Sequence, residues 1–306
     1  MLVAVSGGSD SVALTRVLLA LAEHGDFAVA GLAHLNHRLR PSAKRDETFC
    51  HELAARLRLP CVTESADVRA LAREQGLSLE DAARRVRYAF LERVATELPA
   101  DRIAVGHTED DQAETFLLKL MRGAGLTGLA GIYPRRGRVI RPLLDVSRAD
   151  LRAYLDAVGE RWVEDETNDD LENPRNYVRH RVLPELDRAA GGPSRPAIAR
   201  AAGLIREDGQ WLDDRAEESW RLLASPGPTG FELDAAGLLS TPPPIVRRIL
   251  LRALRQTAGS REIGLDHVEA VMAVLGGGSG GIDVPGARVE LRRGKLVLLE
   301  QKPVPR

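Results

Sequence analysis

Six residues near the N-terminus have the types and spacing of a phosphate-binding loop. They are Ser6-Gly7-Gly8-Ser9-Asp10-Ser11, between an apolar run at 2–5 and an apolar-periodic stretch at 12–21. The glycines permit positive φ and close backbone approach, while the hydroxyls and a helix N-terminus favour an anion. The pattern is neither Walker A nor the dinucleotide motif G-x-G-x-x-G. It therefore predicts a strand, a phosphate-binding turn and a helix of another class.

A second polar stretch follows the apolar residues 103–105. It is His107-Thr108-Glu109-Asp110-Asp111-Gln112-Ala113-Glu114-Thr115. On a helix, His107 would lie one turn from Asp111, and Asp111 one turn from Glu114. Carboxylates this close repel one another unless they meet a positive charge, so the pattern favours a bound magnesium ion or ammonium group. The alternative is an acidic helix start that complements the helix dipole.

Arginine-rich segments supply candidate contacts for anions, because the guanidinium fork suits phosphate and carboxylate groups. Arg87 lies inside an expected helix, and Arg179 follows an acidic loop; a solvated face and mutual charge neutralisation are the alternatives. For RNA phosphates the candidates are a loop and a cluster, namely Arg38, Arg40, Arg135, Arg136 and Arg138.

The elements that must position these residues alternate between strand and helix. Strands are expected near 2–5, 27–34, 61–64 and 102–105, and helices near 10–23, 43–57, 66–75, 79–97 and 109–121. This alternation predicts an α/β fold with a doubly wound parallel sheet, in which ligands bind at the carboxyl ends of the strands. Both polar stretches follow such strand ends, so they should face one crevice.

The composition changes near residue 191, where Gly191-Gly192-Pro193-Ser194 precedes a mostly helical region. Helices are expected near 148–158, 195–222, 243–257 and 265–275, and a glycine-rich connector then leads into a terminal hairpin built from 282–284, 288–292 and 296–299. We therefore expect a catalytic domain at 1–190 and a smaller domain at 191–306 that docks a substrate or supports the first domain.

Composition excludes several classes of protein. The chain has 306 residues, 44% of them hydrophobic, and a formal net charge of -1, so a nucleic acid must be met by a local basic patch. Cys50 and Cys61 form neither a disulfide framework nor a zinc pattern, which favours a reducing, cytoplasmic setting. The sequence shows neither a signal peptide nor a membrane-spanning stretch, so no membrane partner is expected.

Six motifs occur together and in order: SGGSDS, HLNHRLR, EDAARRVRY, HTEDDQAET, RPLL and RNYVRHRVLP. With them, the chain resembles the tRNA(Ile)-lysidine synthetases of the PP-loop ATP pyrophosphatase family, over roughly residues 2–190. The resemblance implies a ligase that joins the ε-amine of L-lysine to C2 of the wobble cytidine of isoleucine tRNA with a CAU anticodon. The cytidine is first adenylated, and AMP and pyrophosphate are released. The chain looks like the short form, which lacks a further C-terminal domain.

The resemblance also implies roles for individual residues. ATP would be bound by Ser6, Gly7, Gly8, Ser9, Asp10 and Ser11. Asp10 would hold Mg²⁺, and lysine would be bound by Arg87, Asp111 and Glu114. The catalytic candidates are Asp10, His107 and Arg179. The family commonly has glycine where Arg38 stands, so the contact made by that loop stays open.

Two other functions fit parts of the sequence. A tRNA thiolase of the same fold class would need an activated cysteine or a C-x-x-C pair, and the two cysteines are far apart. A non-catalytic RNA-binding or nucleotide-binding protein is the other alternative, against which the intact acidic stretch argues. The oligomeric state is open, and a homodimer is compatible with the sequence.

Overall fold

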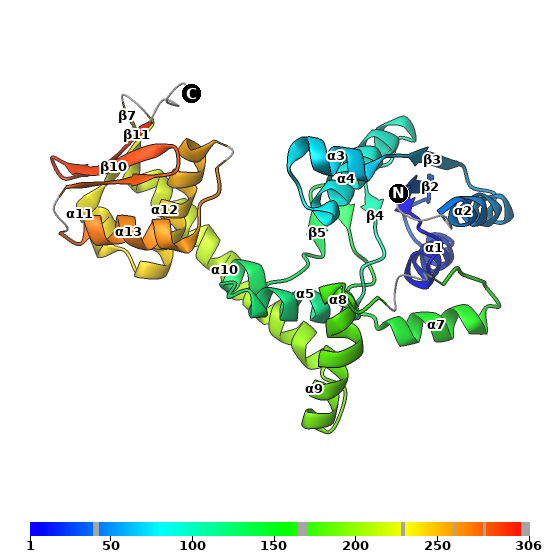
Figure 1. The fold of residues 1–306 in the computed structure, drawn as a ribbon. Coiled ribbons are helices and arrows are strands. Elements are labelled where there is room, and N and C mark those ends of the chain that lie inside the picture. Colours follow the sequence, from blue (N-terminus) through cyan, green and yellow to red (C-terminus); the bar gives the residue numbers. More distant parts are fainter. Residues whose placement is uncertain (39–42, 165–169, 228–229, 260, 278–279, 301–306) are drawn as a thin grey trace. The chain divides into compact units, whose positions relative to one another are not determined.

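The computed structural model describes residues 1–38, 43–164, 170–227, 230–259, 261–277 and 280–300 (Figure 1). The chain divides into two compact units, Met1–Arg206 and Glu207–Arg306, each of which is described by itself below. Among the described residues, no helix combines the length and apolar character needed to cross a membrane.

A six-stranded sheet forms the centre of the first unit, in the order β3-β2-β1-β4-β6-β5. All neighbours pair in parallel except β5 with β6. The strands are β1 (Leu2–Ala4), β2 (Gly31–Asn36), β3 (Cys61–Ser65), β4 (Ile103–Ala104), β5 (Arg135–Arg136) and β6 (Val139–Ile140). From β1, the chain first forms β2 and β3 on one side of β1, and it later forms β4 on the other side. The loops after β1 and β4 are therefore neighbours at the point where strand order reverses, which is where such sheets bind ligands.

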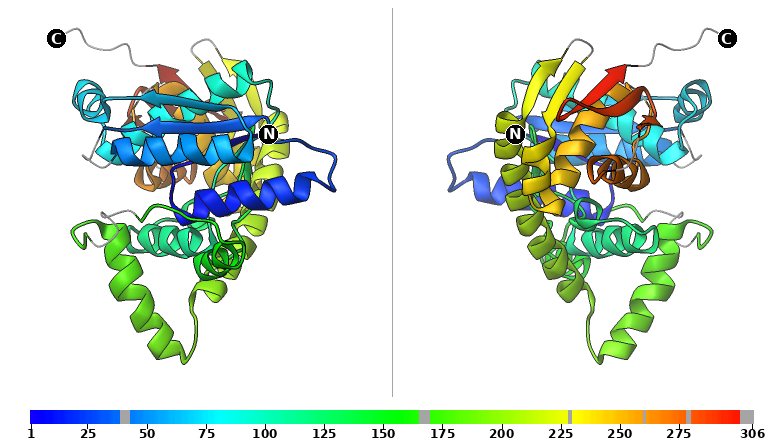
Figure 2. Two further views of the ribbon diagram at one scale, coloured as in Figure 1. Left: turned by 90° about the vertical axis from the view of Figure 1, so that its right-hand side faces the viewer. Right: turned by 90° about the vertical axis from the view of Figure 1, so that its left-hand side faces the viewer.

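Helices cover both faces of this sheet (Figures 1 and 2), which confirms the doubly wound α/β fold. Apolar side chains of α1, α2 and α7 share one core with β1, and α4 packs on the opposite face. The helices of the unit are α1 (Ser9–Ala22), α2 (Ala43–Leu57), α3 (Val68–Gln75), α4 (Leu79–Glu97), α5 (Glu109–Met121), α6 (Leu126–Leu129), α7 (Arg148–Ala157), α8 (Pro174–Tyr177), the π-helical segment η2 (Val178–Val182) and α9 (Leu183–Ala190).

In the second unit, helices pack on a five-stranded antiparallel sheet of order β7-β8-β11-β10-β9. Its elements are α11 (Ala235–Ser240), α12 (Pro243–Ala258), α13 (Leu265–Leu275), β7 (Ala224–Gly227), β8 (Gly230–Asp234), β9 (Gly281–Val284), β10 (Ala287–Arg292) and β11 (Lys295–Glu300). The division between the units falls within α10 (Arg195–Leu223). The expected terminal hairpin is present as β10 and β11, but it belongs to a larger sheet because β8 pairs with β11.

Candidate functional site

The loop between β1 and α1 is built as a tight turn. Gly7 has a φ of 90°, a conformation that favours glycine, and its carbonyl accepts a hydrogen bond from the Val163 amide at 2.9 Å. The Ser11 hydroxyl accepts from the Ser6 amide at 3.1 Å and donates to the Gly8 carbonyl at 3.0 Å. Gly8 is the N-cap of α1, and it has no side chain that would compete with a ligand for the first-turn N–H groups. This geometry is compatible with the expectation that the turn binds an anion.

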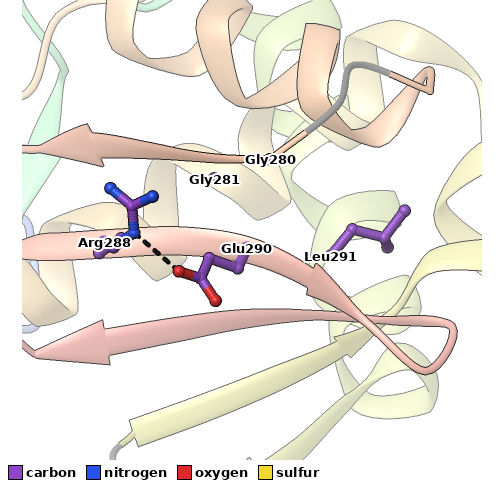
Figure 3. Close-up of a pocket in the computed structure, with 5 residues that line it drawn as sticks. All are labelled: Gly280, Gly281, Arg288, Glu290 and Leu291. Atoms are coloured by element: carbon purple, nitrogen blue, oxygen red, sulfur yellow. Dashed lines mark hydrogen bonds and ion pairs between the residues drawn. The ribbon is translucent and has the colours of Figure 1, made fainter.

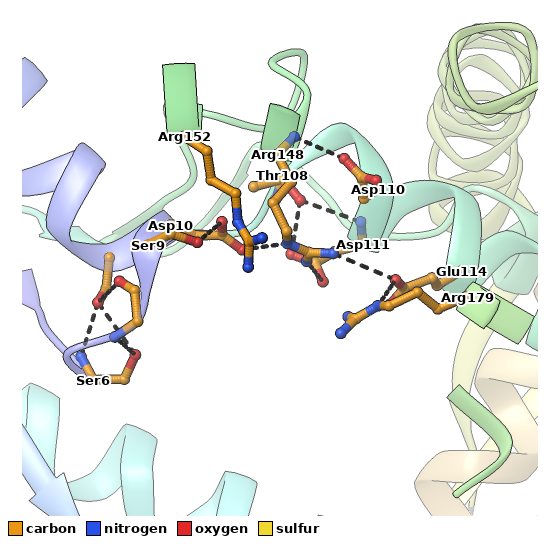
Figure 4. A network of polar contacts seen from close by, with 12 residues as sticks. Ser6, Ser9, Asp10, Thr108, Asp110, Asp111, Glu114, Arg148, Arg152 and Arg179 are labelled. Atoms are coloured by element: carbon orange, nitrogen blue, oxygen red, sulfur yellow. Dashed lines mark hydrogen bonds and ion pairs between the residues drawn. The ribbon is translucent and has the colours of Figure 1, made fainter. Parts of the chain in front are cut away.

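Arg148 joins this loop to α5. Its Nε lies 2.9 Å from Asp10 Oδ2, its Nη2 lies 3.2 Å from Asp111 Oδ1, and its Nη1 lies 3.8 Å from Glu114 Oε1 (Figure 4). The backbone N–H of Arg148 also donates to Asp110 Oδ2 at 2.8 Å. One guanidinium at the start of α7 therefore contacts carboxylates of α1 and α5, the helices that follow the two loops that the sheet topology brings together.

Glu114 has a second arginine partner. Its side chain is fully buried, and Arg179 of η2 donates to both carboxylate oxygens, at 2.7 and 3.2 Å. Arg175 lies farther away, 3.8 Å from Asp111 and 3.9 Å from Glu114. The positive partners that the acidic stretch was expected to require are, in this structure, arginines of the same chain.

Burial and these arginines act in opposite directions on the carboxyl pKa values. Burial raises the pKa of Asp10, and the Arg148 guanidinium offsets only part of this effect. Burial also raises the pKa of Glu114 despite its pairing with Arg179. For Asp111, burial is outweighed by Arg148 and His107, so its pKa lies below the usual value. The site is a place where charged groups are held under desolvation, as is common for functional sites.

His107 lies before α5, so the predicted helical spacing between His107 and Asp111 is wrong. The helix begins at Glu109 because Thr108 is its N-cap, in a capping box with Asp111. The Asp111 carboxylate accepts from the Thr108 amide at 2.9 Å, and the His107 amide donates to the Val105 carbonyl at 3.0 Å. Asp111 therefore serves both the cap and the ion-pair network.

Several basic side chains, Arg87 and Arg141 among them, lie around His107. Burial, reinforced by the charges of Arg141 and Arg87 and opposed by Asp111, lowers the pKa of His107 to about 4. The ring is neutral at pH 7, and its Nδ1 has no hydrogen-bond partner among the described residues. Arg87 contacts His37 at 3.4 Å, and the pKa of His37 is also lowered to about 4, mainly by burial. Neutral imidazoles and cationic guanidiniums are thus combined beside the carboxylates.

Comparison with known protein families agrees with this geometry. A family model described as "PP-loop domain" matches residues 1–186, which include the loop, the acidic helix and the arginines. The chain belongs to the PP-loop domain family. A second model, "TilS substrate binding domain", matches residues 233–297.

The PP-loop chain is similar to curated tRNA(Ile)-lysidine synthases, as its motifs predicted. It is 41% identical to that of Geobacter sulfurreducens, with 89% of this chain and 58% of the relative covered, and 45% identical to that of Thermus thermophilus, with 84% and 48% covered. For Symbiobacterium thermophilum the identity is 38%, with 99% and 66% covered. The chain thus spans about half to two thirds of the length of these relatives. Among solved structures, the U34-tRNA thiolase NcsA from Methanococcus maripaludis has a TM-score of 0.53 at 16% identity, over 67% of this chain and 71% of that one, so it shares the fold.

The arginines that were predicted to contact RNA differ in their exposure and in their contacts. Arg135 and Arg136 are exposed on the edge strand β5, and Arg38 has a φ of 52°. Arg138 donates to the Ala95 carbonyl at 3.1 Å, near the end of α4. Arg40 lies outside the described residues.

Sequence reasoning gave no role to Arg148, which contacts three carboxylates of the PP-loop site. It lies 37 positions from Asp111, a separation with no local periodicity. One signal was available, because Arg148 is the first residue of a helix, where the dipole disfavours a cation. A basic side chain there indicates a carboxylate partner.

The second unit has a shallow pocket of about 340 Å³ at the edge of its sheet (Figure 3). It is lined by Gly280, Gly281, Arg288, Glu290 and Leu291. Arg288 and Glu290 form an ion pair of 2.7 Å with each other, so the polar groups of this pocket satisfy one another.

Proposed function

We propose that this PP-loop chain forms lysidine. It would join the ε-amine of L-lysine to C2 of the wobble cytidine in isoleucine tRNA with a CAU anticodon, with release of AMP and pyrophosphate. One observation carries the proposal: the anion-binding loop and the Asp111–Glu114 carboxylates lie within reach of a single guanidinium, that of Arg148. A phosphate site and an amine site would therefore adjoin. The matches to both domain models and to the synthases support the same reaction.

The reaction has two steps. The cytidine O2 attacks the α-phosphorus of ATP and displaces pyrophosphate, which converts a poor leaving group into AMP. The lysine ε-nitrogen then attacks C2, AMP departs with the former O2, and the nitrogen loses a proton. Both steps need oriented reactants and stabilisation of phosphate charge, and the protein supplies positioned cations and hydrogen-bond donors.

The residue roles proposed here are those that the resemblance to the family implies. The loop Ser6 to Ser11 would bind the ATP phosphates, and His107, whose ring is neutral at pH 7, would assist adenylation through a hydrogen bond of its Nδ1. Asp111 and Glu114 would bind the lysine ammonium, and Arg87 its carboxylate. Arg179 would stabilise developing phosphate charge, from a position where it now pairs with Glu114.

Magnesium fits this site as an ion that enters with ATP. The described residues contain no cluster of three His, Cys, Asp or Glu that would hold a metal alone. Mg²⁺ commonly binds through one or two carboxylates plus phosphate oxygens, and Asp10, at the phosphate loop, supplies one carboxylate. When bound, the ion would neutralise charge on the phosphates.

Neither cysteine supports the alternative function, that of a tRNA thiolase. Burial raises the pKa of Cys50 far above its usual range and that of Cys61 to about 11. A nucleophilic sulfur must be a thiolate, so neither residue is prepared for sulfur transfer.

Mass spectrometry of the tRNA nucleosides tests the proposal. The protein is incubated with Mg²⁺, ATP, labelled lysine and an isoleucine tRNA bearing CAU, and we expect labelled lysidine and AMP in equal amounts. Asp10→Asn, which removes the carboxylate at the phosphate loop, should yield neither product. Unmodified tRNA with no AMP from the wild-type protein would reject lysidine formation and favour a non-catalytic binding role.

A further inference from the structure

Arg148 contacts three carboxylates with one side chain. Its guanidinium lies 2.9 Å from Asp10, 3.2 Å from Asp111 and 3.8 Å from Glu114, and its side chain is 18% exposed. All three contacts are ion pairs. Because the groups are largely buried, water competes less well for these charges. Asp10 lies in the first turn of α1, directly after the loop that follows β1, whereas Asp111 and Glu114 belong to α5. Arg148 therefore links two sites that the proposed function assigns to different substrates.

Each of these contacts conflicts with binding of a substrate cation. A magnesium ion at Asp10 would repel the guanidinium at 2.9 Å from the same carboxylate. An ammonium group at Asp111 and Glu114 would compete with the guanidinium for the same oxygens. The polyphosphate of ATP, in contrast, carries negative charge that attracts arginine. The nucleotide thus changes the balance of charges acting on Arg148 at both sites.

We propose that Arg148 is a positioning residue that couples lysine binding to nucleotide binding. Without nucleotide, the guanidinium holds the three carboxylates and disfavours an ammonium at Asp111 and Glu114. With Mg²⁺ and ATP present, the guanidinium leaves Asp10 and turns toward the phosphates, so Asp111 and Glu114 each lose one arginine partner while Glu114 keeps its pair with Arg179. This inference rests on the proposed function and adds an order of substrate binding to it. Bound nucleotide raises the affinity of the protein for lysine. Reciprocity requires that lysine raise the affinity for nucleotide by the same factor.

The contacts also separate this role from a merely structural one. The backbone N–H of Arg148 anchors the start of α7 to Asp110 at 2.8 Å, whichever side chain is present. Glu114 keeps its 2.7 Å pair with Arg179 when Arg148 is exchanged. A structural ion pair would therefore change stability alone, whereas the coupling role changes how one ligand affects another.

Isothermal titration of the full chain with L-lysine, with and without Mg²⁺ and the α,β-methylene analogue of ATP, measures the coupling. For the wild-type protein we expect the analogue to raise lysine affinity at least about fivefold, a typical allosteric coupling. Arg148→Gln should bind lysine more tightly than wild type without nucleotide, and the analogue should then have almost no effect. Arg148→Lys, which keeps the charge but lacks the fork, should show intermediate coupling.

Arg152→Gln is the matched control. Arg152 lies one turn later on α7 and pairs with Glu164 at 3.1 Å, so this exchange removes the same charge without the three-carboxylate contact. It should retain wild-type coupling. Circular dichroism checks folding, and if Arg148→Gln is unfolded, the wild-type protein and Arg148→Lys still test the proposal.

Two results would overturn the inference alone: equal lysine affinity with and without the analogue in a wild-type protein that forms lysidine, or undiminished coupling in folded Arg148→Gln or Arg148→Lys. A wild-type protein that binds no lysine in either condition and forms no lysidine would instead reject the proposed function, and the inference with it.

Discussion

Glu114 is a fully buried carboxylate held by two hydrogen bonds from Arg179. Exchange to glutamine keeps the size but removes the charge that would attract an ammonium. We expect Glu114→Gln to raise the KM for lysine more than the KM for ATP in steady-state assays of AMP release. The exchange also leaves Arg179 without its anion, so the free energy of unfolding should fall by about 3 kcal/mol in urea denaturation.

Glu109→Gln is the control for this prediction, because Glu109 lies on the same helix at its first position and is partly exposed. It should leave both KM values close to those of the wild type. A larger rise in the KM for ATP than for lysine in Glu114→Gln would assign Glu114 to the nucleotide instead.

His107 gives the protein a defined acid sensitivity. Its pKa of about 4 in the folded chain, below the ordinary 6.5, means that folding favours the neutral ring. The resulting stability is fully present above pH 6.5 and is lost as the pH falls from about 6.5 to about 4. A shift of this size corresponds to about 3 kcal/mol. The groups that face His107 are Asp111, Arg141, Arg87 and Arg175.

Urea denaturation across this pH range measures the effect. We expect the free energy of unfolding of His107→Gln to fall less steeply than that of the wild type between pH 6.5 and pH 4, the window set by the two pKa values. Parallel curves for the two proteins would show that another group, such as His37, dominates the acid response.

At the residue scale, the sequence predicted those groups whose partners are close in the chain. The turn at Gly7 and the carboxylates of Asp111 and Glu114 follow from local spacing. The pairing of Glu114 with Arg179 joins positions 65 apart, and that of Arg148 with Asp10 joins positions 138 apart. No local pattern encodes such pairs, because they depend on how the sheet places its loops.

At the element scale, the loops after β1 and β4 touch at Gly106. A Cβ atom on Gly106 would lie 3.1 Å from the Asp10 carbonyl oxygen and 3.2 Å from the Ser11 amide nitrogen. These neighbours are backbone atoms, so a methyl group would force the two loops apart. We expect Gly106→Ala to raise the KM for ATP and to lower the free energy of unfolding by about 1–3 kcal/mol. Gly192→Ala, where a Cβ would meet nothing within 4 Å, is the control and should alter neither quantity.

At the element scale, apolar periodicity in the sequence predicted several helices but missed two strands. The helices α2, α4, α5 and α13 have the bounds expected from their apolar spacing. Ser78 caps α4, and its hydroxyl accepts from the Asp81 amide. The strands β7 and β8 were not predicted, because Pro226 and several glycines in that region are typical of turns. Their place in the sheet is set by the pairing of β8 with β11, a long-range contact.

At the scale of the whole molecule, each unit has its own apolar core. Leu250 lies in the core of the second unit, and Leu53 lies in a core of the first. Both side chains are buried, at 1% and 0% exposed. We expect Leu250→Ala to destabilise the second unit by about 2–5 kcal/mol and to leave the affinity for an ATP analogue unchanged. Leu53→Ala should instead weaken nucleotide binding. Calorimetry with and without the analogue distinguishes the two variants. Equal loss of nucleotide affinity in Leu250→Ala and Leu53→Ala would contradict independent cores.

The π-helical segment Val178–Val182 makes the protein sensitive to chain length. A π turn accommodates one more residue than an α turn, and such bulges are frequent at functional sites. A π turn holds one more residue than an α turn over nearly the same rotation, so deletion of His180 would leave the residues on either side of the segment in nearly the same relative orientation. An inserted residue would instead rotate Leu183 by about 100° relative to Arg175. Insertions within this short segment should therefore be tolerated far less well than a single deletion.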